Sequence, residues 1–310
     1  MTGGGKKALI IKLGALGDVF LMLGGLEDVS NHINDKVDVL TSRPYAKIFE
    51  KSPFVDRVIV DDRKSRLNIK YLYLLRNQLN SVHYDLVVDY QNSNRTLFYR
   101  RWLLPKLNWC QSGTVSPDIF KSNKTNSREL AKFEFQLNSC GIKSKSLLNP
   151  SLEWLADDQG LYFDPVNGPL IVLLPGSSKK HSYKIWPHYR ELANKLLDHG
   201  FNVFVVPGPE DMDLCNDIPG KLILNIEGKW LNFFQLASLL LQADFVVGND
   251  SGPTHLAASL RTKGLALFGS KTSKYSNNMK RNVMDVWVSE SIADIKSEDV
   301  ARHILSHVQK

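Results

Sequence analysis

The stretch that decides the fold is ALIIKLGALGDVFLMLGGLEDVSNHI, residues Ala8–Ile33. It begins with a short apolar run that only Lys12 interrupts, and the run ends at Gly14. Apolar residues then recur at helical spacing, namely Val19, Leu23, Leu26, Val29 and Ile33. We therefore expect a buried strand, a tight turn and an amphipathic helix. This unit is typical of a parallel α/β sheet, whose ligand crevice opens where the strand gives way to the helix.

Asp18 stands at the start of that helix, in the sequence GALGD. One interpretation is helix capping, because an aspartate oxygen accepts an unpaired backbone N–H and its charge suits the positive helix end. The other is a general base at the mouth of a cleft, with Gly14 and Gly17 letting a substrate approach the backbone. The stretch itself does not separate these two interpretations.

The overall composition is that of an ordinary globular protein with an excess of positive charge. Of the 310 residues, 43% are hydrophobic and 23% are charged, and the formal net charge is +7. The length favours two domains. The charge favours an anionic partner such as a phosphate, an acidic glycolipid, an anionic membrane surface or nucleic acid. We expect neither a membrane-spanning segment nor a signal peptide, because charged residues interrupt the apolar runs.

The three cysteines, Cys110, Cys140 and Cys215, are widely spaced along the chain. Their number is odd, and they form neither a CxxC pair nor a Cys/His cluster that would indicate zinc. We expect them to be buried, reduced thiols of a cytosolic protein without disulfides.

Short β-branched runs alternate with helical stretches along the chain, which predicts βαβ units and parallel sheets. The pattern loosens between about Ser151 and Pro169, where acidic, glycine and proline residues accumulate. We place the domain boundary there, with Rossmann-like domains over residues 1–160 and 161–294. A closing amphipathic helix is expected over Ser297–Val308.

The stretch Gln91–Lys106 combines a polar loop with an aromatic and basic helix. Arg100 and Arg101 on this helix fit solvated side chains on its wet face. With the aromatic residues beside them, they also fit a surface that touches an anionic lipid or acceptor. Both interpretations remain open.

Two loops of the second half have the residues of an anion site. In LPGSSKKHSYKIWP, residues Leu174–Pro187, Ser177 and Ser178 offer small donors, and Lys184 belongs to a cluster of positive charge. Such a loop can hold a diphosphate without a metal, although a solvated basic loop is the alternative.

The second of these loops is GNDSGPTHLAASL, residues Gly248–Leu260. The N–H groups of Ser251 and Gly252 can face an anion at a helix start, although capping alone would explain these residues. His255 is a weak candidate for phosphate contact. In a third loop, VPGPED, Glu210 can accept the hydroxyls of a nucleotide ribose.

These blocks carry a resemblance that spans nearly the whole chain. GALGD, then PGSS with KIWP, then NDSGPTHLAASL followed by ALFG, resemble the ordered motifs of glycosyltransferase family 9, the heptosyltransferases of lipopolysaccharide core assembly. The resemblance implies an α/β GT-B fold, with two facing Rossmann-like domains that contain parallel sheets. It also implies that the closing helix, at about residues 295–310, packs back on the N-terminal, acceptor-binding domain.

The resemblance assigns roles to the matching residues. It makes Asp18 the general base of an inverting transfer, and places the donor in the C-terminal domain. The donor is held by Ser177, Ser178, Lys184, Glu210, Asp250, Ser251, Gly252 and His255, with weaker acceptor contacts at Gly14, Gly17, Arg100 and Arg101. The implied donor is ADP-L-glycero-D-manno-heptose, and the acceptor is a Kdo or heptose of the inner core. No cofactor and no metal are expected, which the lack of a DxD motif allows.

Three other hypotheses stand beside this one. From the last residue of ALFG the chain reads GSKTSKYSNN instead of the family's common Pro-Thr loop, so one alternative is a family 9-like transferase that uses another nucleotide sugar or acceptor. The hypothesis of a nicotinamide dehydrogenase fails because Gly14 and Gly17 form a GxxG pattern and not the GxGxxG pattern of dinucleotide-binding proteins. A third hypothesis is a non-enzymatic protein that binds an anion or nucleic acid through Arg100, Arg101 and Lys121–Arg128. Against it, the positive charge of the chain is dispersed and no recognised nucleic-acid-binding motif is present.

The leading hypothesis also predicts where the protein works and what it meets. We expect a bacterial cytoplasmic enzyme that associates peripherally with the inner face of the cytoplasmic membrane. Its partners would be a nucleotide-sugar donor and an anionic glycolipid acceptor, Kdo-lipid A or core, and not nucleic acid.

Overall fold

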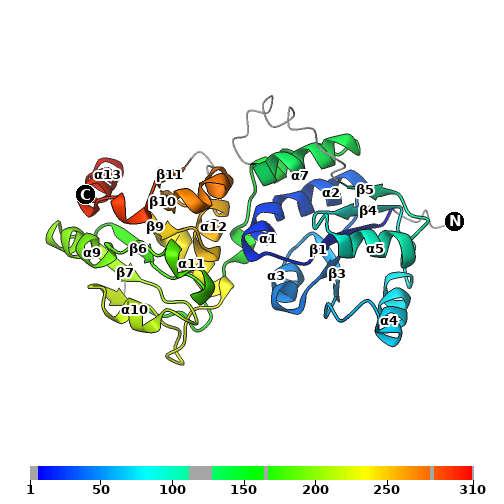
Figure 1. The fold of residues 1–310 in the computed structure, drawn as a ribbon, viewed down its shortest axis with the longest axis horizontal. Helices are drawn as coiled ribbons and strands as arrows, with labels where there is room; N and C mark the ends of the chain where they lie inside the picture. Colours follow the sequence, from blue (N-terminus) through cyan, green and yellow to red (C-terminus); the bar gives the residue numbers. More distant parts are fainter. Residues whose placement is uncertain (1–5, 112–127, 164–166, 280–282, 309–310) are drawn as a thin grey trace. The chain divides into compact units, whose positions relative to one another are not determined.

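The computed structural model describes residues 6–111, 128–163, 167–279 and 283–308. The chain divides into two compact units, Met1–Trp154 and Leu155–Lys310, and Figure 1 labels their elements. The division lies a few residues before the predicted boundary at residue 160. The basic stretch that the nucleic-acid hypothesis used lies outside the described residues up to Ser127.

The first unit is built on a five-stranded parallel sheet in the order β3-β2-β1-β4-β5. Its strands are β1 Ala8–Lys12, β2 Val37–Thr41, β3 Val55–Val60, β4 Leu86–Asp89 and β5 Trp109–Cys110. The predicted first strand is the central one, with Ile10 opposite both Val39 and Val88. Strands β1, β2 and β4 are buried throughout, as expected for parallel strands covered on both faces.

Helices lie between the strands of this unit, as the alternating pattern predicted, and among the described residues three more follow its last strand, β5. They are α1 Leu16–Met22, α2 Gly24–Ile33, η1 Arg43–Tyr45, α3 Ala46–Glu50, α4 Ile69–Leu79, α5 Asn94–Trp102, α7 Arg128–Ser139, α8 Lys145–Leu148 and η2 Glu153–Leu155. The single helix expected after GALGD is divided into α1 and α2 at Leu23. A Cβ at Gly24 would lie 2.1 Å from the Ser146 carbonyl oxygen, and one at Gly25 would lie 2.2 Å from the Tyr90 hydroxyl. These glycines therefore let neighbouring groups approach the start of α2.

The expectation of three reduced thiols is wrong for two of the cysteines. Cys110 at the end of β5 and Cys140 just after α7 form a disulfide, with their Cα atoms 5.9 Å apart. Packing of α7 beside β5 brings them within the distance that a disulfide requires. Cys215 is a free, buried thiol, and burial raises its pKa to about 12.

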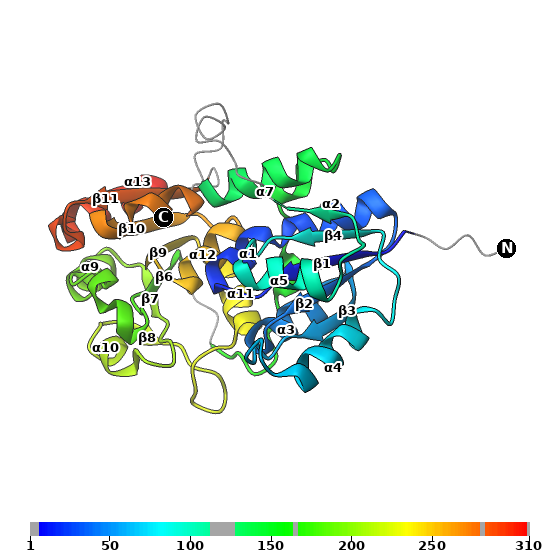
Figure 2. The same cartoon turned by 45° about the vertical axis from the view of Figure 1, so that its right-hand side comes forward.

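The second unit contains a six-stranded parallel sheet in the order β11-β10-β9-β6-β7-β8, which Figure 2 shows from a second side. Its strands are β6 Leu170–Leu174, β7 Asn202–Val205, β8 Lys221–Leu222, β9 Phe245–Asn249, β10 Gly264–Gly269 and β11 Met284–Ser289. Its helices are η3 Lys179–Lys184, α9 Tyr189–Asp198, α10 Met212–Asn216, α11 Phe233–Gln242, α12 Gly252–Ser259, η4 Ser270–Met279, η5 Ile292–Asp294 and α13 Ser297–His307. Both units thus have the predicted parallel α/β architecture.

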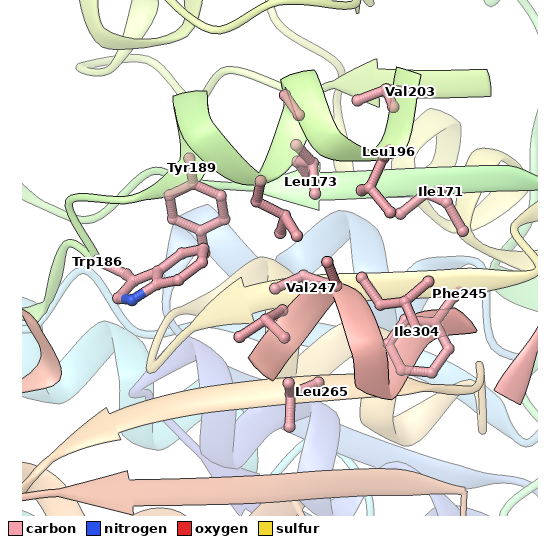
Figure 3. Close-up of a cluster of buried hydrophobic side chains, with 14 of the residues drawn as sticks. Ile171, Leu173, Trp186, Tyr189, Leu196, Val203, Phe245, Val247, Leu265 and Ile304 are labelled. Atoms are coloured by element: carbon pink, nitrogen blue, oxygen red, sulfur yellow. The ribbon is translucent and has the colours of Figure 1, made fainter. Parts of the chain in front are cut away.

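The closing helix α13 belongs to the second unit, which corrects the prediction that it packs back on the N-terminal domain. Its buried face includes Val300 and Ile304, which share one core with Leu196 of α9 and with strands β6 and β9. Figure 3 shows Ile304 next to Phe245, and Leu196 next to Ile171, in this core. An amphipathic pattern predicts an apolar face, but it does not specify which domain covers that face.

No helix within the described residues is both long enough and apolar enough to cross a bilayer.

Candidate functional site

Asp18 lies in the first turn of α1, directly after the central strand β1. The residue at the N-cap position is Ala15, and no side chain caps this helix. Asp18 is therefore not the capping residue, although its charge lies in the first turn, at the positive end of the helix. Its carboxylate is instead partly exposed, and Oδ2 accepts a hydrogen bond from Lys12 Nζ over 3.2 Å.

Lys12 is the buried partner of this carboxylate, and the sequence analysis did not assign it a role. Its ammonium also lies 3.5 Å from the Tyr90 carbonyl oxygen and 5.4 Å from the centre of the Phe133 ring. Burial lowers the pKa of Lys12, while the negative charge of Asp18 opposes that effect. The sequence did contain a signal for this role, because Lys12 interrupts an otherwise apolar strand. A charged residue is rarely buried without a partner, so a lysine in such a strand indicates a nearby acidic group.

The two glycines of the first turn have different surroundings. Gly14 is buried and has a φ of +140°, and a Cβ there would lie 3.1 Å from Cε2 of Tyr45. Backbone conformation and packing thus both favour glycine at this position. Gly17 is half-buried, next to Asp18 in α1. A contact of either glycine with an acceptor remains a prediction.

Arg100 and Arg101 are exposed in the last turn of α5. Nη1 of Arg100 donates to Oε1 of Gln111 over 2.6 Å, and Gln111 in turn donates to Asp89 at the end of β4. This chain of hydrogen bonds connects the helix to the edge of the sheet where the carboxyl ends of its strands lie. Acceptor binding by these arginines remains a prediction.

In the second unit, Lys184 and Asp250 form a close ion pair, with Lys184 Nζ 2.7 Å from Asp250 Oδ2. Asp250 follows directly after β9, and Lys184 ends the short helix η3 that follows β6. His255 of α12 is the third member, with Nε2 at 3.6 Å from Asp250 Oδ1. The structure thus brings together three residues that the sequence analysis named from two separate loops.

Asn249 explains how these loops are held side by side. Its buried amide Nδ2 donates to the Pro175 carbonyl, and its Oδ1 accepts from the Trp186 backbone N–H and from the Tyr189 hydroxyl. One side chain at the end of β9 therefore fixes both sides of the loop that contains Lys184. A buried amide whose N–H and C=O groups all have hydrogen-bond partners holds its neighbours rigidly.

Burial and charge compete at Asp250. Burial favours the neutral acid and would raise its pKa, but His255 and Lys184 outweigh burial, so its pKa lies below the ordinary value. The carboxylate therefore stays ionised at neutral pH and holds the Lys184 ammonium in place.

The PGSS loop is held by two acidic residues of VPGPED. Asp211 accepts a hydrogen bond from the Ser177 N–H over 3.2 Å, and Glu210 accepts one from the Lys179 N–H over 2.8 Å. A Cβ at Gly176 would lie 2.1 Å from Asp211 Oδ2, so a larger residue there would displace the Asp211 carboxylate. Glu210 thus has a structural contact in addition to its predicted contact with ribose. Asp211 was missed, although it belongs to the same quoted loop.

The start of α12 presents backbone donors next to this cluster. Ser251 is its N-cap residue, but its side chain makes no capping bond and instead contacts the Thr254 hydroxyl over 3.1 Å. Gly252 and Pro253 begin the first turn, where the Gly252 N–H has no acceptor within the helix and Pro253 has no N–H. Such a helix start suits an anion.

A cavity of about 310 Å³ opens beside the ion pair and is lined by Lys184 and Asp250. Residues after β10 and β11 complete it, including Lys271 and Glu290. Tyr183 also lines it, and the Lys271 ammonium lies 5.6 Å from the centre of the Tyr183 ring. The sequence analysis missed these three. Their signal was the same as for the others, because each polar residue after a parallel strand lies at the ligand-binding edge of the sheet.

Comparison with known proteins identifies the family. The family model described as Glycosyltransferase family 9 (heptosyltransferase) matches residues 112–305, more than half of the chain. Lipopolysaccharide heptosyltransferase 3 of Escherichia coli is 21% identical over 299 residues, covering 88% of this chain and 86% of that protein. Lipopolysaccharide heptosyltransferase 1 of Pseudomonas aeruginosa is 27% identical over 299 residues, covering 85% of this chain and 78% of that protein.

Solved structures agree in fold. The E. coli heptosyltransferase WaaC with ADP has a TM-score of 0.68 and 20% identity, over 97% of this chain and 100% of that one. A family 9 glycosyl transferase from Veillonella parvula has a TM-score of 0.73 and 16% identity, over 97% and 96% of the two chains. With its two Rossmann-like domains, this chain belongs to glycosyltransferase family 9 and is an enzyme of the GT-B fold.

Proposed function

We propose that this enzyme transfers a heptose from ADP-L-glycero-D-manno-heptose to a Kdo or heptose of the lipopolysaccharide inner core. The observation that carries the proposal is the Lys184–Asp250 pair at the edge of a 310 Å³ cavity, next to the start of α12. This arrangement offers a fixed cation and backbone donors to a diphosphate. The curated relatives are named lipopolysaccharide heptosyltransferases, which supports the choice of sugar and acceptor.

The donor nucleotide is proposed from the same cavity and from a relative. E. coli WaaC has been solved with ADP-2-deoxy-2-fluoro heptose, and it has a TM-score of 0.69 to this chain. In our proposal the diphosphate lies against Lys184, Ser177, Ser178 and the N–H groups of Ser251 and Gly252. Asp250 lies near the sugar hydroxyls, Glu210 accepts from the ribose, and His255 adds a weaker phosphate contact.

The proposed reaction is a single displacement with inversion. Asp18 accepts the proton of the acceptor hydroxyl as that oxygen forms a bond to the anomeric carbon. The bond from this carbon to the diphosphate oxygen breaks, and ADP leaves with the electron pair. Partial exposure of the Asp18 carboxylate, with Lys12 behind it, supports this role. Lys184 and the start of α12 would stabilise the charge that develops on the leaving diphosphate.

We further propose that the transfer needs no metal ion. The stabilisation that a divalent cation gives a departing diphosphate is supplied here by the Lys184 ammonium and the helix start. A chelator should therefore leave the rate of transfer unchanged. Loss of the transfer in chelator that returns with Mg²⁺ would contradict this part of the proposal.

We propose that the acceptor is met at a cytoplasmic membrane surface through the α4–α5 face, where exposed apolar residues stand among basic ones. Leu67 and Ile69 are 89% and 80% exposed, and Tyr73, Leu74, Leu97 and Trp102 extend this apolar surface. The guanidinium of Arg66 lies 5.8 Å from the centre of the Phe98 ring, which joins the start of α4 to α5. Apolar and basic residues together favour an anionic bilayer, and Arg100 and Arg101 lie on the same α5 helix.

The membrane proposal is tested by sedimentation with vesicles. The double variant Leu67→Ser/Ile69→Ser should lose binding to vesicles that contain phosphatidylglycerol, while phosphatidylcholine vesicles bind neither protein. Ile226→Ser is the matched control, because Ile226 is 74% exposed in the second unit. If the double variant and the control bind equally, the α4–α5 face is not the contact surface.

The proposed function is tested by thermal shift and by mass analysis of products. ADP should raise the melting temperature, whereas NAD and an oligonucleotide should not, because a ligand stabilises the state that binds it. Incubation with ADP-heptose and Kdo-lipid A, or a heptosylated core, should add the mass of one heptose. If transfer occurs only from another nucleotide sugar, the donor in our proposal becomes that nucleotide sugar instead of ADP-heptose. Stabilisation by an oligonucleotide without any transfer would overturn the proposal.

A further inference from the structure

We infer that Asp285, His303 and His307 form a binding site for one zinc-like divalent cation, separate from the proposed transfer site. His303 and His307 are four residues apart on α13, so both side chains lie on one face of the helix. Asp285 is on β11, the edge strand of the second sheet. One ligand atom from each residue lies within 4.8 Å of the other two.

The distances fit the coordination sphere of a small cation. His303 Nε2 lies 3.0 Å from Asp285 Oδ2, and His307 Nε2 lies 3.9 Å from the same oxygen. Bond lengths of about 2.0–2.1 Å in a tetrahedral zinc site separate neighbouring ligand atoms by roughly 3.3 Å. The observed separations lie on both sides of that value, so small side-chain movements would complete three ligands. Water would take the fourth position.

The hydrogen bonds around the two histidines leave their Nε2 atoms free to bind a cation. Nδ1 of His307 lies 2.8 Å from the His303 carbonyl oxygen, to which it can donate its proton, and this leaves Nε2 as a lone-pair donor toward Asp285. A ligating histidine commonly has such a second contact, which fixes its tautomer and orientation. His303 Nε2 is buried, and it has no hydrogen-bond partner of good geometry among the described residues despite its closeness to Asp285.

An apolar shell surrounds the buried half of the cluster. The centre of the His303 ring lies 5.1 Å from that of Trp287 and 6.0 Å from that of Phe245. Such surroundings limit the access of water and strengthen the attraction between a cation and its ligands. Two imidazoles and one carboxylate suit zinc or a similar transition metal, whereas magnesium prefers oxygen ligands alone.

The location indicates a structural role rather than a catalytic one. Asp285 is near the amino end of β11, whereas the cavity residue Glu290 directly follows its carboxyl end. Five residues of extended strand separate these positions by about 16 Å. A bound ion would instead connect α13 to the edge strand and hold the C-terminal helix on the second sheet.

The test uses the full chain without a polyhistidine tag, and two ligand variants, Asp285→Asn and His307→Gln. His199→Gln is the matched control, because His199 Nδ1 also contacts a carbonyl four residues earlier at a helix end, at 2.7 Å from Lys195. Zinc affinity is measured by competition with a chromogenic chelator. Cobalt substitution then reports tetrahedral coordination through visible absorption.

We expect the unmodified chain and His199→Gln to bind one zinc ion, and zinc to raise their melting temperatures. Each ligand variant should bind roughly tenfold or more weakly and lose the zinc-dependent rise, and magnesium should have no effect. The inference is overturned if the unmodified chain does not bind zinc in the micromolar range. It is also overturned if both ligand variants bind as tightly as the control. Transfer activity is not part of this readout, so the result is independent of the proposed function.

Discussion

Each of the two domains contains one lysine–aspartate pair beside the end of a central strand, and the two pairs have opposite burial. In the first domain Lys12 is 3% exposed and Asp18 is 37% exposed. In the second, Asp250 is 6% exposed and Lys184 is 17% exposed. The more accessible member is thus the carboxylate in one pair and the ammonium in the other.

We propose that this difference decides which atom of each pair meets a substrate. A buried charge stabilises and orients its partner, and the more exposed partner is free to act on a ligand. On this basis the first pair presents a carboxylate suited to accept a proton, and the second presents a cation suited to bind a diphosphate. Four experiments test the comparison, beginning with the largest expected effect.

Replacing Asp18 by asparagine should have the largest effect, because it removes the proposed base and keeps the shape of the side chain. Turnover should fall by about 10²- to 10⁴-fold while ADP binding stays unchanged, as for the loss of general-base assistance. Steady-state kinetics and calorimetric titration with ADP measure the two quantities.

The matched control for this variant is Asp62→Asn. Asp62 is 35% exposed, nearly as much as Asp18, and is also paired with a basic residue, with its Oδ1 2.8 Å from Arg43 Nη2. A fall in melting temperature with most of the turnover retained in Asp18→Asn would mean that the first pair is only structural.

Replacing Lys184 by glutamine should weaken ADP binding by roughly 10- to 100-fold, because a charge-assisted hydrogen bond is lost. The variant should also melt earlier, since it leaves the buried Asp250 carboxylate with only His255 as a partner. The double variant Lys184→Gln/Asp250→Asn should regain melting temperature without regaining affinity. Lys180→Gln, in the exposed part of the same loop, is the control. If both lysine variants bind ADP like the unmodified protein, Lys184 does not bind the donor.

The two pairs should both make the protein more stable as pH rises, but in separate pH windows, because the folded-state pKa is lowered in each case. The pKa of Asp250 lies below the ordinary value of 3.8, so its stabilisation is present above pH 3.8 and is lost as pH falls through the folded-state pKa. The pKa of Lys12 lies below the ordinary value of 10.5, so the unfolded chain binds the extra proton and stability rises with pH up to 10.5.

Denaturant midpoints measured across pH test these signatures. Asp250→Asn should remove part of the acid-side loss, and Lys12→Met should remove part of the alkaline-side rise. Lys229→Gln should change neither, because that lysine belongs to an exposed pair. Equal pH curves for Lys12→Met and the unmodified protein would contradict the burial of a charged Lys12.

Replacing His255 by glutamine should have the smallest effect. Its Nε2 is 3.6 Å from Asp250, longer than a hydrogen bond, while Lys184 keeps its contact at 2.7 Å. ADP affinity should therefore change by less than roughly fivefold. A loss as large as that of Lys184→Gln would make His255 a direct donor ligand, and the second pair would become a triad.

The parallel sheets and most loops of the candidate site could be predicted from the sequence. Strand and helix periodicities are local, and polar residues after buried strands converge at one edge of a parallel sheet. That is why Lys184, Asp250 and His255, from separate segments, were named before they were seen together. Lys271 and Glu290 follow the same rule and were missed, because GSKTSKYSNN was noted only as a departure from the family's pattern and no quoted motif contains Glu290.

Features that depend on tertiary contact could not be predicted in this way. The break between α1 and α2 reflects groups that approach Gly24 and Gly25 from distant segments. The pairing of Cys110 with Cys140 depends on how α7 packs beside β5, which spacing along the chain does not encode. The apolar face of α13 was predicted, but its partner domain was not.

The Cys110–Cys140 bridge has a practical consequence for anyone handling the protein. If a protease cuts the backbone once between these residues, the bridge still joins the two pieces covalently. Nicked material would migrate as one band on a denaturing gel without thiols and separate into two bands once a reductant is added. Comparing the two lanes therefore reports both the integrity of a preparation and the oxidation of its bridge.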